Sequence, residues 1–230
     1  MSRKPRLFVA GIPCHIIQRG NNRNPIFFSD EDYYFFLQVL QEAKRKHPCF
    51  VYGYCLMTNH FHLLIEPKEK ENISLLMKLL GAKYVRYVNR TYKRTGTLWE
   101  GRFKCSLIEE ELYFLACLHY IEMNPLRAGI INSPELYPWS SYRFRALGEK
   151  SPVLDFDPWY NGLGQNTYER QLKYRHFFQN SLSESTWKLI RETTNKGGIF
   201  GSNRFKEHIE KMIGREIIFR TPGRPKKEGK

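Results

Sequence analysis

The chain lacks several features that would place it in common classes of protein. Its 230 residues contain no run of about 18 apolar residues, so no membrane-spanning helix is expected. The charged start, Met1–Arg6, leads to no apolar stretch of the signal-peptide kind. Only five cysteines occur, an odd number without a C-x-x-C pair, which argues against a disulfide framework or a structural zinc cluster. These absences predict a soluble protein of a reducing, cytoplasmic compartment.

Acidic residues are also scarce relative to basic ones. The chain has 37 Lys and Arg against 23 Asp and Glu, a net charge of +14 and a pI of about 9.6. Such a balance favours a polyanionic partner, with nucleic acid as the first candidate and an anionic membrane surface as the second. Aromatic residues make up 15% of the chain, and rings interleaved with cations are typical of proteins that grip single strands. Charge alone does not decide this, because a protein can be basic without binding a polyanion.

Hydrophobic periodicity predicts an α+β protein. Ser29 and Asp30 can cap a helix, and the spacing of Ile73, Leu76 and Leu80 gives a second helix an apolar face. The expected order is strand, helix, strand, strand, helix, strand and helix, at about residues 15–18, 31–46, 50–56, 60–66, 73–92, 102–108 and 110–122. The first six elements follow the ferredoxin-like split βαβ pattern, an antiparallel sheet with helices on one face. A helical C-terminal region is expected to follow it.

The composition divides the chain into three parts. Residues 1–148 form the main predicted domain. After Gly148, prolines and aspartates resemble a linker, and residues 149–214 form an accessory region that is expected to bind DNA. This region reads as helical and amphipathic from about residue 167 to residue 213, with an interruption at Gly197-Gly198. Residues 215–230 are a predicted basic, flexible tail with six Lys or Arg against two Glu.

Two histidines flank one bulky apolar residue in the segment His60-Phe61-His62. Side chains alternate across a strand, so His60 and His62 share one face while Phe61 anchors the other face in a core. Paired imidazoles can hold a divalent metal and leave coordination positions open for a substrate. The motif is short, and the alternative is that both histidines face solvent or bond each other.

Two further sets of residues could take part in chemistry. Tyr120 and Asn124 lie four residues apart, so a helix would aim the hydroxyl and the amide at one point. Taken singly, they have simpler interpretations as a packed tyrosine and a helix-terminal asparagine. The segment 83–104 carries seven Lys or Arg against Glu100, and could also be an ordinary solvated helix flank. The aromatic residues interleaved in it are Tyr84, Tyr87, Tyr92, Trp99 and Phe103.

Together these groups could transesterify a phosphodiester. A tyrosine oxygen that attacks phosphorus forms a covalent phosphotyrosine and conserves the bond energy for religation. A metal would hold the scissile phosphate and offset the charge on its oxygens. Two imidazoles and an amide oxygen leave positions for phosphate and water, and phosphate chemistry favours Mg²⁺ or Mn²⁺ over zinc. The histidines expected to have no functional role are His15, His47, His176 and His208.

Four ordered motifs match one known family. They are Arg19-Gly20-Asn21-Asn22-Arg23, Leu56 to Leu64, Gly96 to Phe103 and Tyr120 to Gly129. In these motifs the chain resembles the HUH-class single-tyrosine transposases, in particular the REP-associated tyrosine transposases, over roughly the first 145 residues. The resemblance implies a metal-dependent enzyme that cuts single-stranded DNA near short imperfect hairpins. Such an enzyme stays joined to the 5′ phosphate and leaves a 3′ hydroxyl free to rejoin.

The resemblance also implies roles for individual residues. His60 and His62 carry over as metal ligands, with Mg²⁺ or Mn²⁺ as the expected ion, and Asn124 carries over as the third, polar ligand. Tyr120 carries over as the nucleophile. Residues 1–148 would then be the catalytic domain of a transposase. Its expected partner is single-stranded or hairpin DNA, including palindromic repeats, and both a monomer and a homodimer are compatible with the resemblance.

Contacts with nucleic acid are expected from these motifs, from the basic helix flank and from the tail. The candidates are Arg19, Asn21, Asn22, Arg86, Arg90, Trp99, Arg102 and Arg224. Arg224 lies in Gly223-Arg224-Pro225, which resembles the core of an AT-hook that binds the minor groove. Pro222 stands where such a hook has arginine, so an unspecific basic tail is the preferred interpretation.

Two rival functions use the same features. A non-catalytic nucleic-acid-binding protein or repressor could have the same fold, and loss of His60, His62 or Tyr120 would have indicated it. A replication or conjugation relaxase would use the same chemistry, but its usual greater length and different motif order disfavour it. All three residues are present, so the favoured interpretation is a single-strand-specific DNA endonuclease and strand transferase.

Overall fold

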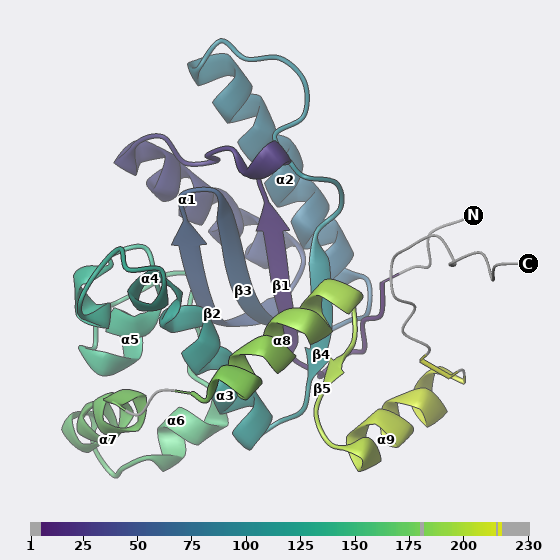
Figure 1. The fold of residues 1–230 in the computed structure, drawn as a ribbon, viewed down its shortest axis with the longest axis vertical. Helices are drawn as coiled ribbons and strands as arrows, with labels where there is room; N and C mark the ends of the chain where they lie inside the picture. Colours follow the sequence, from purple (N-terminus) through teal and green to yellow (C-terminus); the bar gives the residue numbers. More distant parts are fainter. Residues whose placement is uncertain (1–5, 180–181, 215, 218–230) are drawn as a thin grey trace, which may run out of the picture.

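A computed structural model of the chain describes residues 6–179, 182–214 and 216–217 (Figure 1). Its centre is a five-stranded sheet in the order β2-β3-β1-β4-β5. The strands are β1 (Cys14–Arg19), β2 (Cys49–Met57), β3 (His60–Pro67), β4 (Lys104–Ile108) and β5 (Ile199–Phe200). Neighbouring strands are antiparallel except β4 and β5, which run parallel. The first four strands have the order of a ferredoxin-like sheet, so the predicted α+β class is confirmed.

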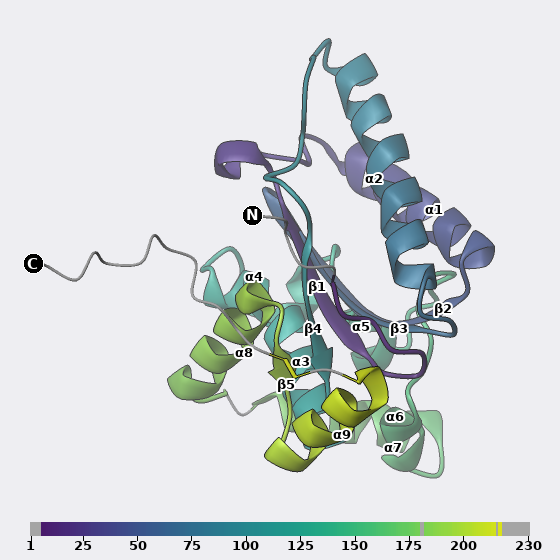
Figure 2. The same ribbon diagram turned by 90° about the vertical axis from the view of Figure 1, so that its right-hand side faces the viewer.

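Two long helices lie together on one face of the sheet (Figure 2). α1 spans Asp30–Lys46, and α2 spans Asn72–Thr91. A capping box starts α1, because the side chains of Ser29 and Asp32 each accept a hydrogen bond from the other's backbone N–H. Tyr84 of α2 is fully buried and its hydroxyl donates to the Ile26 carbonyl oxygen, which ties α2 to the loop before α1. The opposite face of the sheet is left to later elements.

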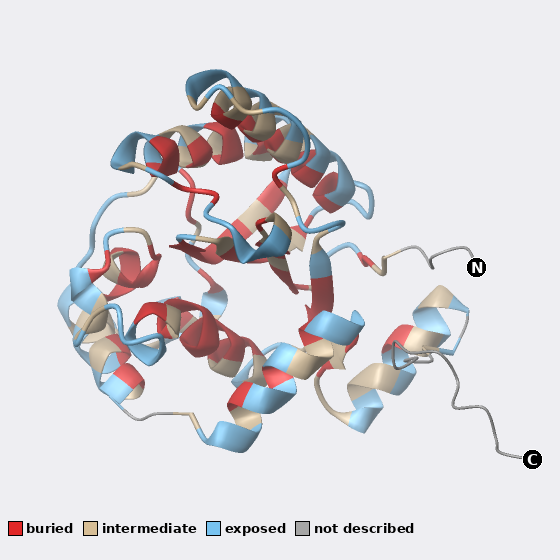
Figure 3. Ribbon diagram, turned by 45° about the horizontal axis from the view of Figure 1, so that its top comes forward, coloured by how far each residue is buried: buried red, intermediate tan, exposed pale blue. Residues whose placement is uncertain are grey.

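Helices from the second half of the chain cover that opposite face (Figure 2). α3 (Leu112–Glu122) packs on β2, and α8 (Glu184–Lys196) packs on β4 and β1. The remaining elements are α4 (Asn124–Arg127), α5 (Tyr142–Ala146), α6 (Pro158–Gly162), α7 (Thr167–Gln179), α9 (Asn203–Ile213) and the 3-10 turns η1 (Asn21–Arg23) and η2 (Pro134–Leu136). Buried residues gather on both sides of the sheet (Figure 3), in one cluster under α1 and α2 and a second between the sheet, α3, α7 and α8.

Several element boundaries differ from those that periodicity predicts. α3 begins at Leu112 rather than near residue 110, because Glu111 before it has a positive φ of 59° and is not helical. The stretch expected to be helical from residue 167 to residue 213 contains α7, α8 and α9. The predicted break at Gly197-Gly198 is confirmed, since Gly197 ends α8, but the strand β5 that follows it was not predicted. A strand of two residues is too short to show a period-2 pattern. In the described ranges, no helix is long and apolar enough to cross a membrane.

Alternation along the strands decides which side chains reach each face. Phe61 of β3 packs under α1, where its ring centroid lies 4.8 Å from that of Phe36. His60 and His62 therefore point to the opposite face, as the pattern predicts. β1 follows the same rule, since Ile16 joins the cluster under α1 and α2 while His15 stacks on His62. The two predicted metal histidines thus lie on the face that α3 and α8 cover.

A buried ion pair fixes the region around α5 and gives a test of the fold. Arg145 is fully buried and donates to the Asp157 carboxylate at 2.7 Å, and Glu122 lies 4.0 Å from its guanidinium. We expect Arg145→Met to lower the free energy of unfolding by about 3–5 kcal/mol, because it leaves a buried carboxylate without its cation. Urea unfolding followed by circular dichroism measures this loss.

The matched control lies two residues away on the same helix. Arg143 pairs with Glu149 at 3.3 Å, but both side chains are partly exposed to solvent. Water screens such a pair, so Arg143→Met is expected to cost less than about 1 kcal/mol. Equal losses of unfolding free energy in Arg143→Met and Arg145→Met would show that burial does not determine how much an ion pair stabilises this protein.

Candidate active site

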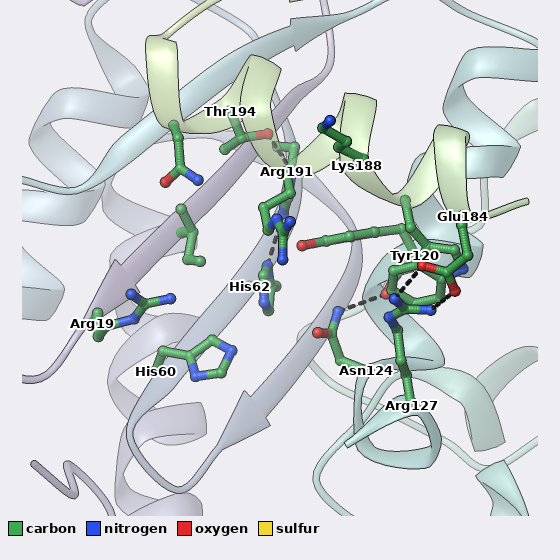
Figure 4. A pocket seen from close by; sticks show the side chains of 14 residues that line it. Arg19, His60, His62, Tyr120, Asn124, Arg127, Glu184, Lys188, Arg191 and Thr194 are labelled. Atoms are coloured by element: carbon green, nitrogen blue, oxygen red, sulfur yellow. Dashed lines mark hydrogen bonds and ion pairs between the residues drawn. The ribbon is translucent and has the colours of Figure 1, made fainter. Parts of the chain in front are cut away.

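One cavity of about 200 Å³ collects the four residues that the sequence singled out for chemistry (Figure 4). His60 and His62 enter it from β3, while Tyr120 and Asn124 enter it from α3 and from the start of α4. The ring centroids of His62 and Tyr120 are 5.7 Å apart. Arg19 at the end of β1 also lines the cavity. Segments far apart in the sequence thus present two imidazoles, a phenol, an amide and a guanidinium to one space.

Hydrogen bonds orient both histidines in the same way. Nδ1 of His60 lies 2.7 Å from Oδ1 of Asn59, and Nδ1 of His62 lies 2.8 Å from Nε2 of His15. Because Nδ1 is engaged on each ring, Nε2 is the nitrogen left to bind a ligand. The two rings are 5.0 Å apart between centroids and inclined at 78°. Two Nε2 atoms on neighbouring rings are a donor set that suits one divalent ion.

Burial keeps these imidazoles in the neutral form that binds metals. The pKa of His60 falls to about 4, chiefly because burial disfavours its charged form and also because Arg19 is close. Burial likewise holds the pKa of His62 well below its usual value, with smaller contributions from His60, His15 and Arg19. Neither ring needs to lose a proton before it can coordinate a cation near neutral pH.

Asn124 supplies the polar group opposite the histidines. Its Nδ2 donates to the backbone oxygen of Tyr120 at 2.6 Å, and its amide oxygen has no hydrogen-bond partner among the described residues. Figure 4 shows that oxygen turned toward His60 and His62. Within the described ranges, no three His, Cys, Asp or Glu side chains are grouped so as to hold a metal ion. Two imidazoles and an amide oxygen fit a hard divalent ion that keeps positions open for substrate oxygens.

Tyr120 is held inside the cavity by its ring. Its side chain is only 6% exposed, and its ring centroid lies 4.6 Å from that of Trp187 on α8. Its hydroxyl points into the cavity toward His62 (Figure 4). Burial raises the pKa of Tyr120 to about 12, while Arg191, Arg127 and Arg19 act in the opposite direction. These cations would favour the phenolate over the phenol.

α8 forms one wall of the cavity, and sequence reasoning did not find it. Glu184, Trp187, Lys188, Arg191 and Thr194 all line the cavity from this helix. The segment reads as an amphipathic helix, but nothing in its pattern says which surface it covers. Only the packing of α8 on β1 and β4 brings its polar side to the histidines and the tyrosine.

α4 and α8 are joined at the edge of this wall. The Arg127 guanidinium donates two hydrogen bonds to the Glu184 carboxylate, one of them 2.7 Å long. The same guanidinium lies 4.7 Å from the centre of the Trp187 ring, in a cation–π contact. Both groups of the ion pair are largely exposed, so the pair positions side chains more than it stabilises the fold.

His15 was expected to have no function, and the structure places it directly behind His62. It is 1% exposed, and its ring stacks on that of His62 with centroids 5.1 Å apart. Burial lowers the pKa of His15 to about 3, so the ring is neutral. The sequence does indicate that His15 lies on the same face of the first strand as Ile17 and Arg19, because side chains alternate along a strand. That rule does not tell which strand lies beside β1.

The candidates for nucleic-acid contact lie in several places. Of these, Arg19 lines the catalytic cavity. Asn21 and Asn22 form η1 directly after β1, and Asn22 adopts a left-handed backbone with φ 53°. Arg86 and Arg90 are exposed on α2 and do not line the catalytic cavity. Arg224 lies outside the described residues.

Trp99 and Arg102 line a second cavity of about 490 Å³ on the other face of the sheet. Gln18 and Phe61 form part of the wall of this second cavity. Their neighbours on β1 and β3 reach the catalytic cavity instead. The Trp99 ring packs on those of Phe61 and Tyr84 with centroids about 6 Å apart. The motif that contains Trp99 and Arg102 therefore does not contribute to the cavity around Tyr120.

Comparison with known proteins gives consistent relatives. Residues 8–124 match a protein family described as IS200-like transposases. A candidate REP-associated tyrosine transposase of Haemophilus influenzae is 25% identical over 127 residues, which are 51% of this chain and 72% of that protein. A solved structure of a REP-associated tyrosine transposase bound to a REP hairpin superposes with a TM-score of 0.56 at 17% identity, over 68% of this chain and 93% of that one. Its likeness shows the shared fold.

Proposed function

The chain belongs to the IS200-like transposase family, and from this premise we propose that it cleaves and rejoins single-stranded DNA at hairpins through a covalent bond to Tyr120. The observation that carries the proposal is the convergence of His60, His62, Tyr120 and Asn124 on one cavity. A non-catalytic DNA-binding protein would not need a phenol aimed at two neutral imidazoles whose Nε2 atoms are free. The family places the reaction on DNA, and the cavity supports the choice of residues.

Tyr120 would act as the nucleophile. Its phenolic oxygen forms a bond to the scissile phosphorus while the bond from phosphorus to the 3′ oxygen breaks. The phenol releases its proton to water, and the departing 3′ oxygen takes up a proton to become a hydroxyl. The 5′ phosphate stays joined to the protein as a phosphotyrosine. Attack by a 3′ hydroxyl on that phosphotyrosine reverses the step, joins the strand and restores the tyrosine.

His60, His62 and Asn124 would hold a divalent ion, Mg²⁺ or Mn²⁺. Such an ion polarises a phosphate oxygen and offsets the negative charge that grows on it. Arg19, Arg127 and Arg191 act alongside as fixed positive charges around the cavity, and their charges favour ionisation of Tyr120. The tyrosine has a raised pKa of about 12, so it depends on this positive surrounding to attack at neutral pH.

Hairpin or other single-stranded DNA is the proposed partner. The relative of solved structure is bound to a REP hairpin, and the net charge of +14 suits a polyanion. Trp99, Phe103 and Arg102 at the second cavity offer rings and a cation to unpaired bases and their phosphates. Asn21 and Asn22 lie next to Arg19 and would contact the strand that enters the catalytic cavity.

Cleavage of a labelled hairpin tests this function. The substrate is a single-stranded oligonucleotide that carries an imperfect palindrome from the DNA flanking the gene, with its full duplex as the matched control. With Mg²⁺ or Mn²⁺ we expect nicking of the single strand, little cleavage of the duplex and no reaction in excess chelator. Equal cleavage of both substrates, or activity that survives the chelator, would contradict the proposal.

A further inference from the structure

A chain of hydrogen bonds runs from the candidate metal site into α8. Nδ1 of His62 lies 2.8 Å from Nε2 of His15. Nδ1 of His15 lies 2.8 Å from Oγ1 of Thr194, and that oxygen lies 2.9 Å from Oγ of Ser106 on β4. The four side chains come from β3, β1, α8 and β4. Three strands of the sheet and a helix of the C-terminal region thus meet behind one metal-facing imidazole.

A metal on His62 would allow only one direction for these bonds. Nε2 of His62 would then carry no proton, so the proton of the neutral ring would sit on Nδ1 and be donated to Nε2 of His15. The proton of neutral His15 then sits on its own Nδ1 and is donated to Oγ1 of Thr194. The Thr194 hydroxyl keeps its single proton for Ser106. Each polar atom along the path then has one role, and the hydroxyl of Thr194 is the acceptor for Nδ1–H of His15.

Burial makes this assignment rigid. His15 and His62 are each 1% exposed, and Thr194 and Ser106 are each 2% exposed. Water therefore does not compete for these bonds, and a side chain that lost its partner would stay unpaired. The stacking of the two histidine rings at 18° between their planes adds a geometric constraint. His62 can neither rotate nor exchange its protonated nitrogen without disturbing all four residues.

We infer that Thr194 and His15 are positioning residues, which orient the His62 ring so that its Nε2 faces the metal position. The inference rests on the proposed function, because it assumes that His62 binds a metal. It goes beyond that function in giving α8 a part in the reaction. Thr194 lies outside residues 8–124, the part that matches the family, so the C-terminal region would support the metal site from behind His62.

Thr194→Val is the variant that isolates the hydroxyl, since valine keeps the shape of the side chain and removes only the donor and acceptor. Groups behind a metal ligand typically change metal affinity by about 10–100-fold. We expect Mn²⁺ affinity, measured by electron paramagnetic resonance of free Mn²⁺, to fall by that factor in Thr194→Val. Thr194→Ser keeps the hydroxyl and should stay within about threefold of the wild type. Thr193→Val, at the neighbouring position on α8, is the matched control and should behave as the wild type.

A second readout uses protein saturated with Mg²⁺ and does not depend on cleavage. Long-range ¹H–¹⁵N spectra of histidine-labelled protein report which ring nitrogen carries the proton. We expect the Nδ1–H form of His15 and His62 in the wild type and Thr194→Ser, and a mixture of forms in Thr194→Val. A merely structural threonine would lower the melting temperature without changing tautomers or Mn²⁺ affinity.

The outcomes separate the two proposals. Wild-type protein that binds no Mn²⁺ would overturn the metal-dependent function itself. Wild-type protein that binds Mn²⁺, with unchanged affinity and tautomers in Thr194→Val, would overturn the inference and leave the function standing. Equal losses in Thr194→Val and Thr194→Ser would also overturn it, because the hydroxyl would then not be the group that matters.

Discussion

Tyr120→Phe is expected to lower the rate of strand cleavage by at least about a thousandfold and to remove the covalent protein–DNA product. The oxygen that would attack phosphorus is lost, while the ring keeps its contacts with Trp187 and His62. Among the described residues, none forms a hydrogen bond with the Tyr120 hydroxyl, so the substitution leaves no buried partner unsatisfied. Stability and binding of hairpin DNA should therefore stay close to those of the wild type.

A substrate labelled at its 3′ end makes the covalent product visible on a denaturing gel, because the protein stays on the downstream fragment. Tyr113→Phe is the matched control, since Tyr113 lies on the same helix and packs against Phe200 away from the cavity. It should give adduct at the wild-type rate. An adduct that persists in Tyr120→Phe would assign the nucleophile to another tyrosine.

His62→Ala should reduce metal-dependent cleavage by a comparably large factor, about a hundredfold or more, at every metal concentration. It removes one proposed ligand and also leaves Nε2 of His15 without its partner in a buried site. His60→Ala should show a similar defect. Asn124→Ala should be milder, because imidazole is the stronger ligand and water can replace an amide oxygen.

Cleavage rate against Mn²⁺ concentration measures these effects. His208→Ala is the matched control, because His208 is exposed on α9 and does not line the cavity. It should follow the wild-type curve. Full recovery of His62→Ala at high Mn²⁺ would show that His60 and His62 are not both direct ligands needed for the reaction.

Local pattern determined much of this architecture. The backbone of a strand alternates side chains, so the run around Phe61 was enough to put His60 and His62 on one face. The spacing of apolar residues gave the order of the first six elements, which the sheet order β2-β3-β1-β4 confirms. Tyr120 and Asn124 were predicted to share a helix face, and they reach one cavity although α3 ends at Glu122 and α4 begins at Asn124. These features depend on backbone geometry over a few residues.

What lies behind and around the catalytic residues was decided only by tertiary packing. His15 and His62 are 47 residues apart, and His15 and Thr194 are 179 residues apart, yet each pair meets at 2.8 Å. Trp99 belongs to a motif of the same family resemblance as His62, but it faces a different cavity because Phe61 and His62 point to opposite sides of β3. No periodicity encodes which helix will cover which face of a sheet. That choice follows from the burial of whole surfaces, and it is why the amphipathic pattern of α8 predicted a helix but not a wall of the active site.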